Sequence, residues 1–67
     1  MTRADVRRCA ALVWSDDPRV ADRAAELLRE EALRVRRQGL AAWRAFCADV
    51  FEGGGLGATL ALGDACD

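Results

Sequence analysis

The feature that most constrains the fold lies mid-chain, where a helix start signal precedes two apolar stripes that meet at Gly39. Asp17 and Pro18 form that signal. Proline at the first helical position loses no hydrogen bond, and the aspartate caps free backbone amides. Apolar residues recur at helical spacing over residues 18–38 and again over 40–52. The two stripes are offset by about 100° on a continuous helical wheel, so a break at Gly39 turns both towards one core.

A further amphipathic segment precedes this region. Thr2 and Asp5 have the spacing of a shortened capping box, and apolar side chains share one face of residues 3–14. The sequence therefore predicts an all-α fold, a small three-helix bundle. The expected helices span about 3–14, 18–38 and 40–52.

Gly39 leaves one alternative open. It either ends a helix in a left-handed conformation or lies inside a longer helix, at a cost of about 1 kcal/mol relative to alanine. In the second case the chain is a helical hairpin with one continuous helix over 18–52. Leu33, Leu40 and Cys47 recur every seven residues, which suits a coiled-coil seam.

The glycine run Gly53-Gly54-Gly55 is expected to end helical structure, because glycine loses the most backbone entropy on folding. We therefore predict a helical domain over 1–52 and a glycine-rich, partly flexible tail over 53–67. Residues 58–62 either form one helical turn against the core or stay mobile.

The chain has 67 residues, enough for one domain. A core of this size rarely supplies more than about 3–5 kcal/mol, so small proteins usually add disulfides, a metal or a partner subunit. There is no histidine, and three cysteines at wide spacing suit neither a disulfide framework nor a zinc site. Association with a protein partner or with further copies is the remaining route.

Charge is distributed unevenly along the chain. Residues 1–44 hold ten arginines against seven acidic residues, a net charge of +3, whereas residues 45–67 hold four acidic residues and no base. This asymmetry can steer a partner or orient subunits head to tail. The apolar run 9–14 is too short for a signal peptide, and no run approaches a membrane span. The expected location is cytoplasmic, with reduced thiols.

Catalytic, metal and cofactor sites are not expected. Without histidine there is no ordinary triad, and the glycine run lacks the strand and the Lys–Ser/Thr pair of a phosphate loop. Cys9 and Cys47 lie on apolar faces, where cysteine acts as a small hydrophobe. A disulfide between them, or a three-thiolate metal site, is the alternative. Cys66 is the expected reactive thiol.

The aromatic residues have two interpretations. Trp14, Trp43, Phe46 and Phe51 could fill the contact between the first and third helices. Trp43 could instead form a surface anchor, because tryptophan and arginine dominate binding hot spots. The residues predicted to bind a partner are Leu33, Arg36, Arg37, Leu40, Trp43 and Arg44.

Glu31 falls inside the apolar face of residues 18–38. It is either an edge carboxylate paired with an arginine of the first helix or a specificity charge in a subunit seam. The arginines near Trp43 could also bind nucleic acid weakly, but acidic residues on the same helix and the overall charge of −1 favour a solvated charged face.

The predicted function is that of a non-enzymatic helical interaction module that self-associates or docks on a larger protein. An accessory subunit, an assembly factor or an inhibitor of the kind that phages encode would fit.

A second hypothesis rests on the order of segments along the chain. A helical segment, a Gly-Gly step, Thr59 and Cys66 resemble the leader–core plan of ribosomally made, modified peptides. That resemblance implies a leader over 1–54 and a core over 55–67.

Overall fold

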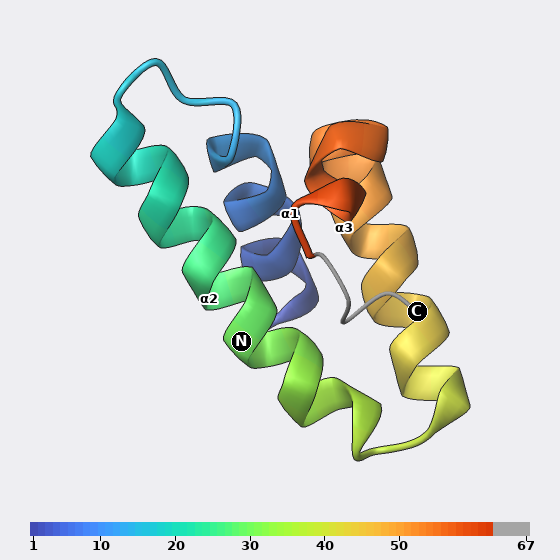
Figure 1. Cartoon of the computed structure of the whole chain (residues 1–67). Helices are drawn as coiled ribbons and strands as arrows, with labels where there is room; N and C mark the ends of the chain where they lie inside the picture. Colours follow the sequence, from blue (N-terminus) through green and yellow to red (C-terminus); the bar gives the residue numbers. More distant parts are fainter. Residues whose placement is uncertain (63–67) are drawn as a thin grey trace.

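The protein folds into three helices packed around one core (Figure 1). A computed structural model describes residues 1–62. The helices are α1 (Arg3–Leu12), α2 (Pro18–Arg36) and α3 (Leu40–Leu60). The predicted three-helix bundle is confirmed. Within the described residues, no helix is both long and apolar enough to cross a membrane.

Both predicted helix starts are present. The Thr2 hydroxyl accepts a 3.2 Å hydrogen bond from the Asp5 amide, and the Asp5 carboxylate accepts one from the Thr2 amide. The Asp17 carboxylate accepts a 3.0 Å bond from the Arg19 amide, with Pro18 at the first helical position. These side chains satisfy amides that have no partner inside the helix.

Gly39 separates α2 from α3, so the alternative of one continuous helix over 18–52 is wrong. Its φ of 119° and ψ of 174° are far from helical values and lie where side chains other than glycine are strained. The turn lets α3 run back along the bundle (Figure 1). The apolar faces of α2 and α3 can then meet in one core.

The expectation that helical structure ends at residue 52 is wrong, because α3 continues through Gly53 and Gly54. Both glycines lie against the backbone of α1. A Cβ on Gly53 would lie 2.8 Å from the Cα of Arg7, and one on Gly54 would lie 2.8 Å from the carbonyl carbon of Ala10. The glycines are therefore a close helix–helix contact. The packing that they permit offsets their low helix propensity.

The helix axis bends at Gly55, whose φ of 70° and ψ of −164° are not helical. At the bend, the Trp14 indole donates a 2.7 Å hydrogen bond to the Gly54 carbonyl. The chain then returns to the bundle, where Ala58 and Leu62 are buried. Of the two alternatives for residues 58–62, the helical turn against the core is the one observed. The rest of the predicted tail lies outside the described residues.

The core is built from small and aliphatic side chains of all three helices. α3 packs more extensively against α1 than against α2, consistent with the close approach of α1 to the glycines of α3. The buried hydrophobic residues are Val6, Ala10, Ala24, Leu28, Ala32, Val35, Phe46, Val50, Ala58 and Leu62.

The aromatic core predicted between α1 and α3 is largely wrong. Phe46 is buried, but Trp14 and Phe51 are exposed and Trp43 is only partly buried. Glycine and alanine fill the α1–α3 contact and leave no room there for large rings. Cys9 and Cys47 pack against the core as predicted, and no disulfide joins them. Cys66 lies outside the described residues.

Candidate functional site

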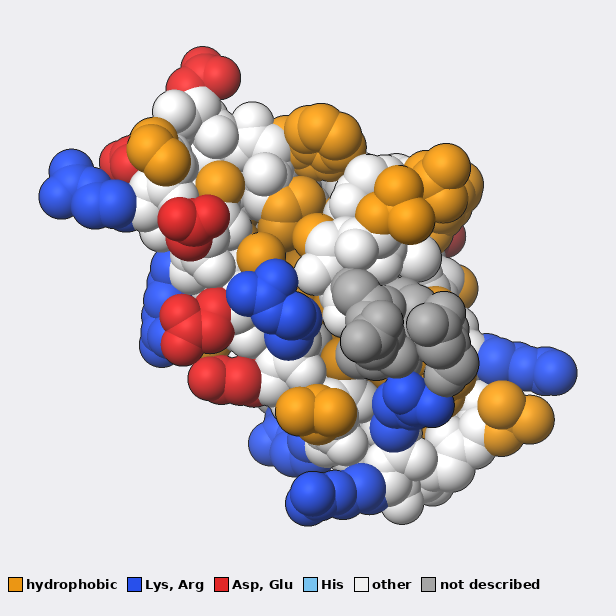
Figure 2. All heavy atoms as spheres, viewed as in Figure 1, with side chains coloured by type: hydrophobic (Ala, Val, Ile, Leu, Met, Phe, Trp, Pro, Cys, Tyr) orange, Lys and Arg blue, Asp and Glu red, His pale blue; other side chains and the backbone are white. Residues whose placement is uncertain are grey.

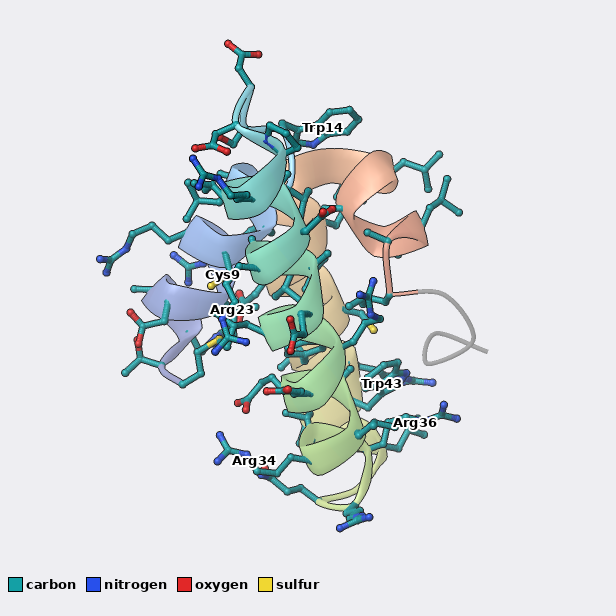
Figure 3. All side chains as sticks on the ribbon, turned by 60° about the vertical axis from the view of Figure 1, so that its left-hand side comes forward. Cys9, Trp14, Arg23, Arg34, Arg36 and Trp43 are labelled. Carbon is teal, nitrogen blue, oxygen red and sulfur yellow. The ribbon has the colours of Figure 1, made fainter. Side chains whose placement is uncertain are left out.

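An aromatic and cationic stack lies beside the α2–α3 turn. The guanidinium carbon of Arg36 is 5.2 Å from the ring centroid of Trp43, a cation–π distance. Trp43 also stacks on Phe46, with centroids 5.7 Å apart and ring planes inclined by 23°. Arg36 and Trp43 lie together on one side of the bundle (Figure 3). Because Phe46 is buried, the Trp43 ring rests on a fixed base.

A hollow of about 210 Å³ opens at this stack, lined by Arg36, Gly39, Leu40 and Trp43. We call these four residues the Trp43 surface. Leu40 is 65% exposed although it begins a helix next to the core. Beside this leucine stand tryptophan and arginine, two of the residue types most enriched in binding hot spots.

The surroundings of the Trp43 surface are strongly basic. Between Glu31 and Asp49 the chain carries four arginines and no acidic residue. Basic side chains gather where α2 meets α3, at the lower end of the molecule in Figure 2. Arg37 and Arg44 are exposed, and neither forms an ion pair within residues 1–62. This end of the molecule therefore carries a local excess of positive charge.

The structure brings together only part of the predicted site. Arg36, Leu40 and Trp43 share the hollow, and Arg37 and Arg44 are exposed in the segments that flank it. Leu33 is exposed but does not line the hollow. It lies about 140° around α2 from the buried Leu28, since successive α-helical residues are 100° apart.

One of the two interpretations of Glu31 expected it to pair with an arginine of the first helix. No such pair forms within residues 1–62. Glu31 accepts a 2.9 Å hydrogen bond from Arg34 on its own helix, and its carboxylate is 3.7 Å from the Met1 amino group. Arg34 points away from the Trp43 surface in Figure 3. Arg34 follows Glu31 by about one helical turn, a spacing at which side chains meet readily.

Exposed apolar side chains occur on all three helices. Single exposed leucines are common on proteins, but larger apolar patches mark interaction sites. Within residues 1–62, the large hydrophobic residues with the greatest exposure are Met1, Leu12, Trp14, Val20, Leu33, Leu40, Phe51, Leu56 and Leu60.

Within residues 1–62, the most buried charged residue is Asp49, which is 2% exposed and was not among the predicted site residues. Its carboxylate accepts hydrogen bonds of 2.8 and 3.2 Å from Arg3 and one of 3.3 Å from Arg7. No local sequence pattern predicts these bonds, because Arg3 and Arg7 are 46 and 42 residues from Asp49 in the chain. This cluster connects the start of α1 to the middle of α3.

The Asp49 cluster is structural in its chemistry. The Arg3 guanidinium, with help from Arg7, holds the pKa of the Asp49 carboxyl below its usual range. A general acid near neutral pH must still hold its proton, whereas a carboxyl with a lowered pKa is ionised there. Within residues 1–62, no three cysteine or carboxylate side chains are grouped so that they could hold a metal ion.

The ion pairs of the buried Asp49 carboxylate with the exposed Arg3 and Arg7 side chains predict a loss of stability in acid. An unfolded aspartate has a pKa of about 3.9, whereas the folded-state pKa of Asp49 is lowered. The stabilisation is therefore complete above the unfolded pKa and is lost as the pH falls through the folded pKa. Urea midpoints of the wild type are expected to fall between pH 6 and pH 3, values chosen to bracket about 3.9.

Asp49→Asn isolates this contribution, because its amide does not titrate. The variant should be less stable at pH 6, and its midpoint should fall less on acidification. Asp5, whose pKa is lowered by the hydrogen bond from the Thr2 amide, still titrates in both proteins and serves as the internal reference. Equal acid sensitivity in the two proteins would contradict the assignment.

Comparisons with protein-family models, curated protein sequences and solved structures find no match for this chain. The features of the chain that bear on function are therefore those of its surface: the Trp43 surface, its basic surroundings and the exposed apolar residues.

Proposed function

We propose that this chain is a non-enzymatic interaction module that docks on another protein through the Trp43 surface. The observation that carries the proposal is the stack of Arg36 on Trp43 beside the exposed Leu40. Tryptophan and arginine contribute most to binding when they sit in pockets that become dry in the complex. The hollow at this stack has room for an apolar side chain of a partner.

The charge around the hollow indicates the kind of partner. Arg37 and Arg44 add positive charge to a segment that contains no acidic residue. A matching partner carries an apolar anchor residue flanked by aspartate or glutamate. The anchor would fill the hollow, and the carboxylates would meet the arginines. Such charges mainly raise the association rate and exclude wrong partners.

A co-purification experiment tests the proposal. The tagged wild-type protein, produced in its native host, should retain a specific partner, and Trp43→Ala should lose it. Alanine at an interface hot spot typically costs about 2 kcal/mol or more, roughly a thirtyfold loss of affinity. Leu60→Ala is the matched control, since Leu60 is exposed on the same helix but outside the Trp43 surface.

A second variant separates binding from folding, because Trp43 also packs on the core. The Arg37→Glu/Arg44→Glu double variant changes only exposed side chains and should weaken binding without changing the unfolding midpoint. Retention of the same partner by both variants would refute the proposal. Release of bound DNA or RNA, in place of protein, would favour the nucleic-acid alternative.

The leader–core hypothesis receives less support. Processing enzymes favour exposed, flexible chain, whereas Gly53 and Gly54 lie in a helix against α1. The mass of the protein from its native host distinguishes the two functions, since cleavage near Gly54 would remove the part of the chain that follows it.

A further inference from the structure

A second, more apolar hollow lies between α1 and α2, away from the Trp43 surface. Its volume is about 340 Å³. Leu12 and Val20, which both line it, are 44% and 38% exposed. Cys9 and Arg23 of this region appear on the same side of the bundle in Figure 3. The lining residues are Cys9, Leu12, Arg19, Val20, Arg23, Ala24 and Leu27. We call this surface the α1–α2 groove.

The apolar part of the groove runs along α2. Val20 and Leu27 are seven residues apart, and Ala24 lies between them. Residues at this spacing share one helix face, as in the seam of a coiled coil. Ala24 is only 3% exposed and forms the floor of the groove, so a second helix would contact mainly Val20 and Leu27.

The charges beside this seam are arranged symmetrically. Arg19 and Glu30 are equally far from the midpoint between Ala24 and Ala25, and so are Arg23 and Glu26. The basic pair lies in the first half of α2 and the acidic pair in the second half. If two copies of α2 pack antiparallel about this midpoint, each arginine faces a glutamate of the other copy.

We propose that the α1–α2 groove binds a second copy of this chain, with the two α2 helices antiparallel across a two-fold axis near Ala24. A two-fold interface joins the same patch on both subunits and must be self-complementary. The order of charges on α2 meets this condition, and a parallel arrangement would place like charges together. Val20 and Leu27 of each copy would cover the groove of the other.

Two of the charges are available for such contacts. Arg19 is 94% exposed, and its ion pair with Asp17 is long, at 3.8 Å. Glu30 forms no ion pair within residues 1–62, because Arg34 pairs with Glu31. Arg23 has a 3.2 Å pair with Glu26 on its own helix, which the second copy would extend into a network.

Sedimentation measurements over a range of concentrations test this interface by charge reversal. Arg19→Glu alone and Glu30→Arg alone should each weaken dimerisation by about tenfold or more, because each places two like-charged pairs across the axis. The double variant should restore the wild-type affinity. The two positions lie about 16 Å apart along one helix, so mutual rescue within a single chain is excluded.

Circular dichroism and urea midpoints should show that these surface variants remain folded. Arg29→Glu is the matched control, a charge reversal on α2 at an exposed residue outside the groove, and it should leave the dimer intact. A monomer at every soluble concentration would overturn the proposal, as would a double variant that fails to regain the dimer. Either result leaves docking through the Trp43 surface untouched, since the co-purification test uses other residues.

Discussion

Gly54→Val is expected to destabilise the protein by about 3 kcal/mol, the upper end of what overpacking usually costs. A Cβ at this position would overlap the Ala10 carbonyl oxygen and the Ala58 side chain. One of these obstacles is backbone, so relief requires α1 and α3 to move apart. Because a core of this size supplies only about 3–5 kcal/mol, much of the variant should be unfolded at 37 °C. Urea unfolding followed by circular dichroism measures the change.

Ala48→Val is the control for this variant. Ala48 is exposed on the same helix, so its substitution reports only the lower helix propensity of valine, no more than about 0.7 kcal/mol. If Gly54→Val cost no more than Ala48→Val, the glycines would not be a close helix–helix contact. The expectation that the glycine run ends helical structure and begins a partly flexible tail would then regain support.

Leu28→Ala is expected to cost about 2–5 kcal/mol, the usual range for removing a fully buried leucine side chain. Leu28 is completely buried and belongs to the core cluster that all three helices share. Loss of its branched side chain leaves a cavity that the neighbours can fill only by shifting. The free energy of unfolding, extrapolated from urea titration, is the relevant measurement.

Leu33→Ala on the same helix is the matched control. Leu33 is 59% exposed, so the identical change should cost less than about 0.5 kcal/mol, as is usual at surfaces. Similar losses for the two variants would mean that Leu33 is buried in solution. Burial of Leu33 by another copy would make its effect depend on protein concentration, which the same titrations detect.

The local signals of helix formation were readable from the sequence. Thr2, Asp17 and Pro18 act within a few residues of the amides that they cap or replace. The phase offset of the two stripes predicted the break at Gly39, because one core cannot face two directions on a straight helix. Arg36, Leu40 and Trp43 were also predicted together, since their spacing across a turn keeps them close.

Other features depend on contacts between distant parts of the chain. Gly53 and Gly54 have poor helix propensity, yet they are helical because α1 lies directly against them. Trp14 was predicted to be buried, but its indole bonds to the Gly54 carbonyl at the bend and its ring remains exposed. No local pattern marks these positions.

The sequence by itself determined the helical class and the starting points of α1 and α2, and it favoured the break at Gly39 that the structure then decided. These follow from side-chain periodicity and from hydrogen bonds between residues close in the chain. The tertiary structure alone decided where α3 ends, that Asp49 is buried against Arg3 and Arg7, and that the α1–α2 groove exists. Each of these depends on how near one helix comes to another. That distance is set by small residues on both surfaces together, and neither segment carries it alone.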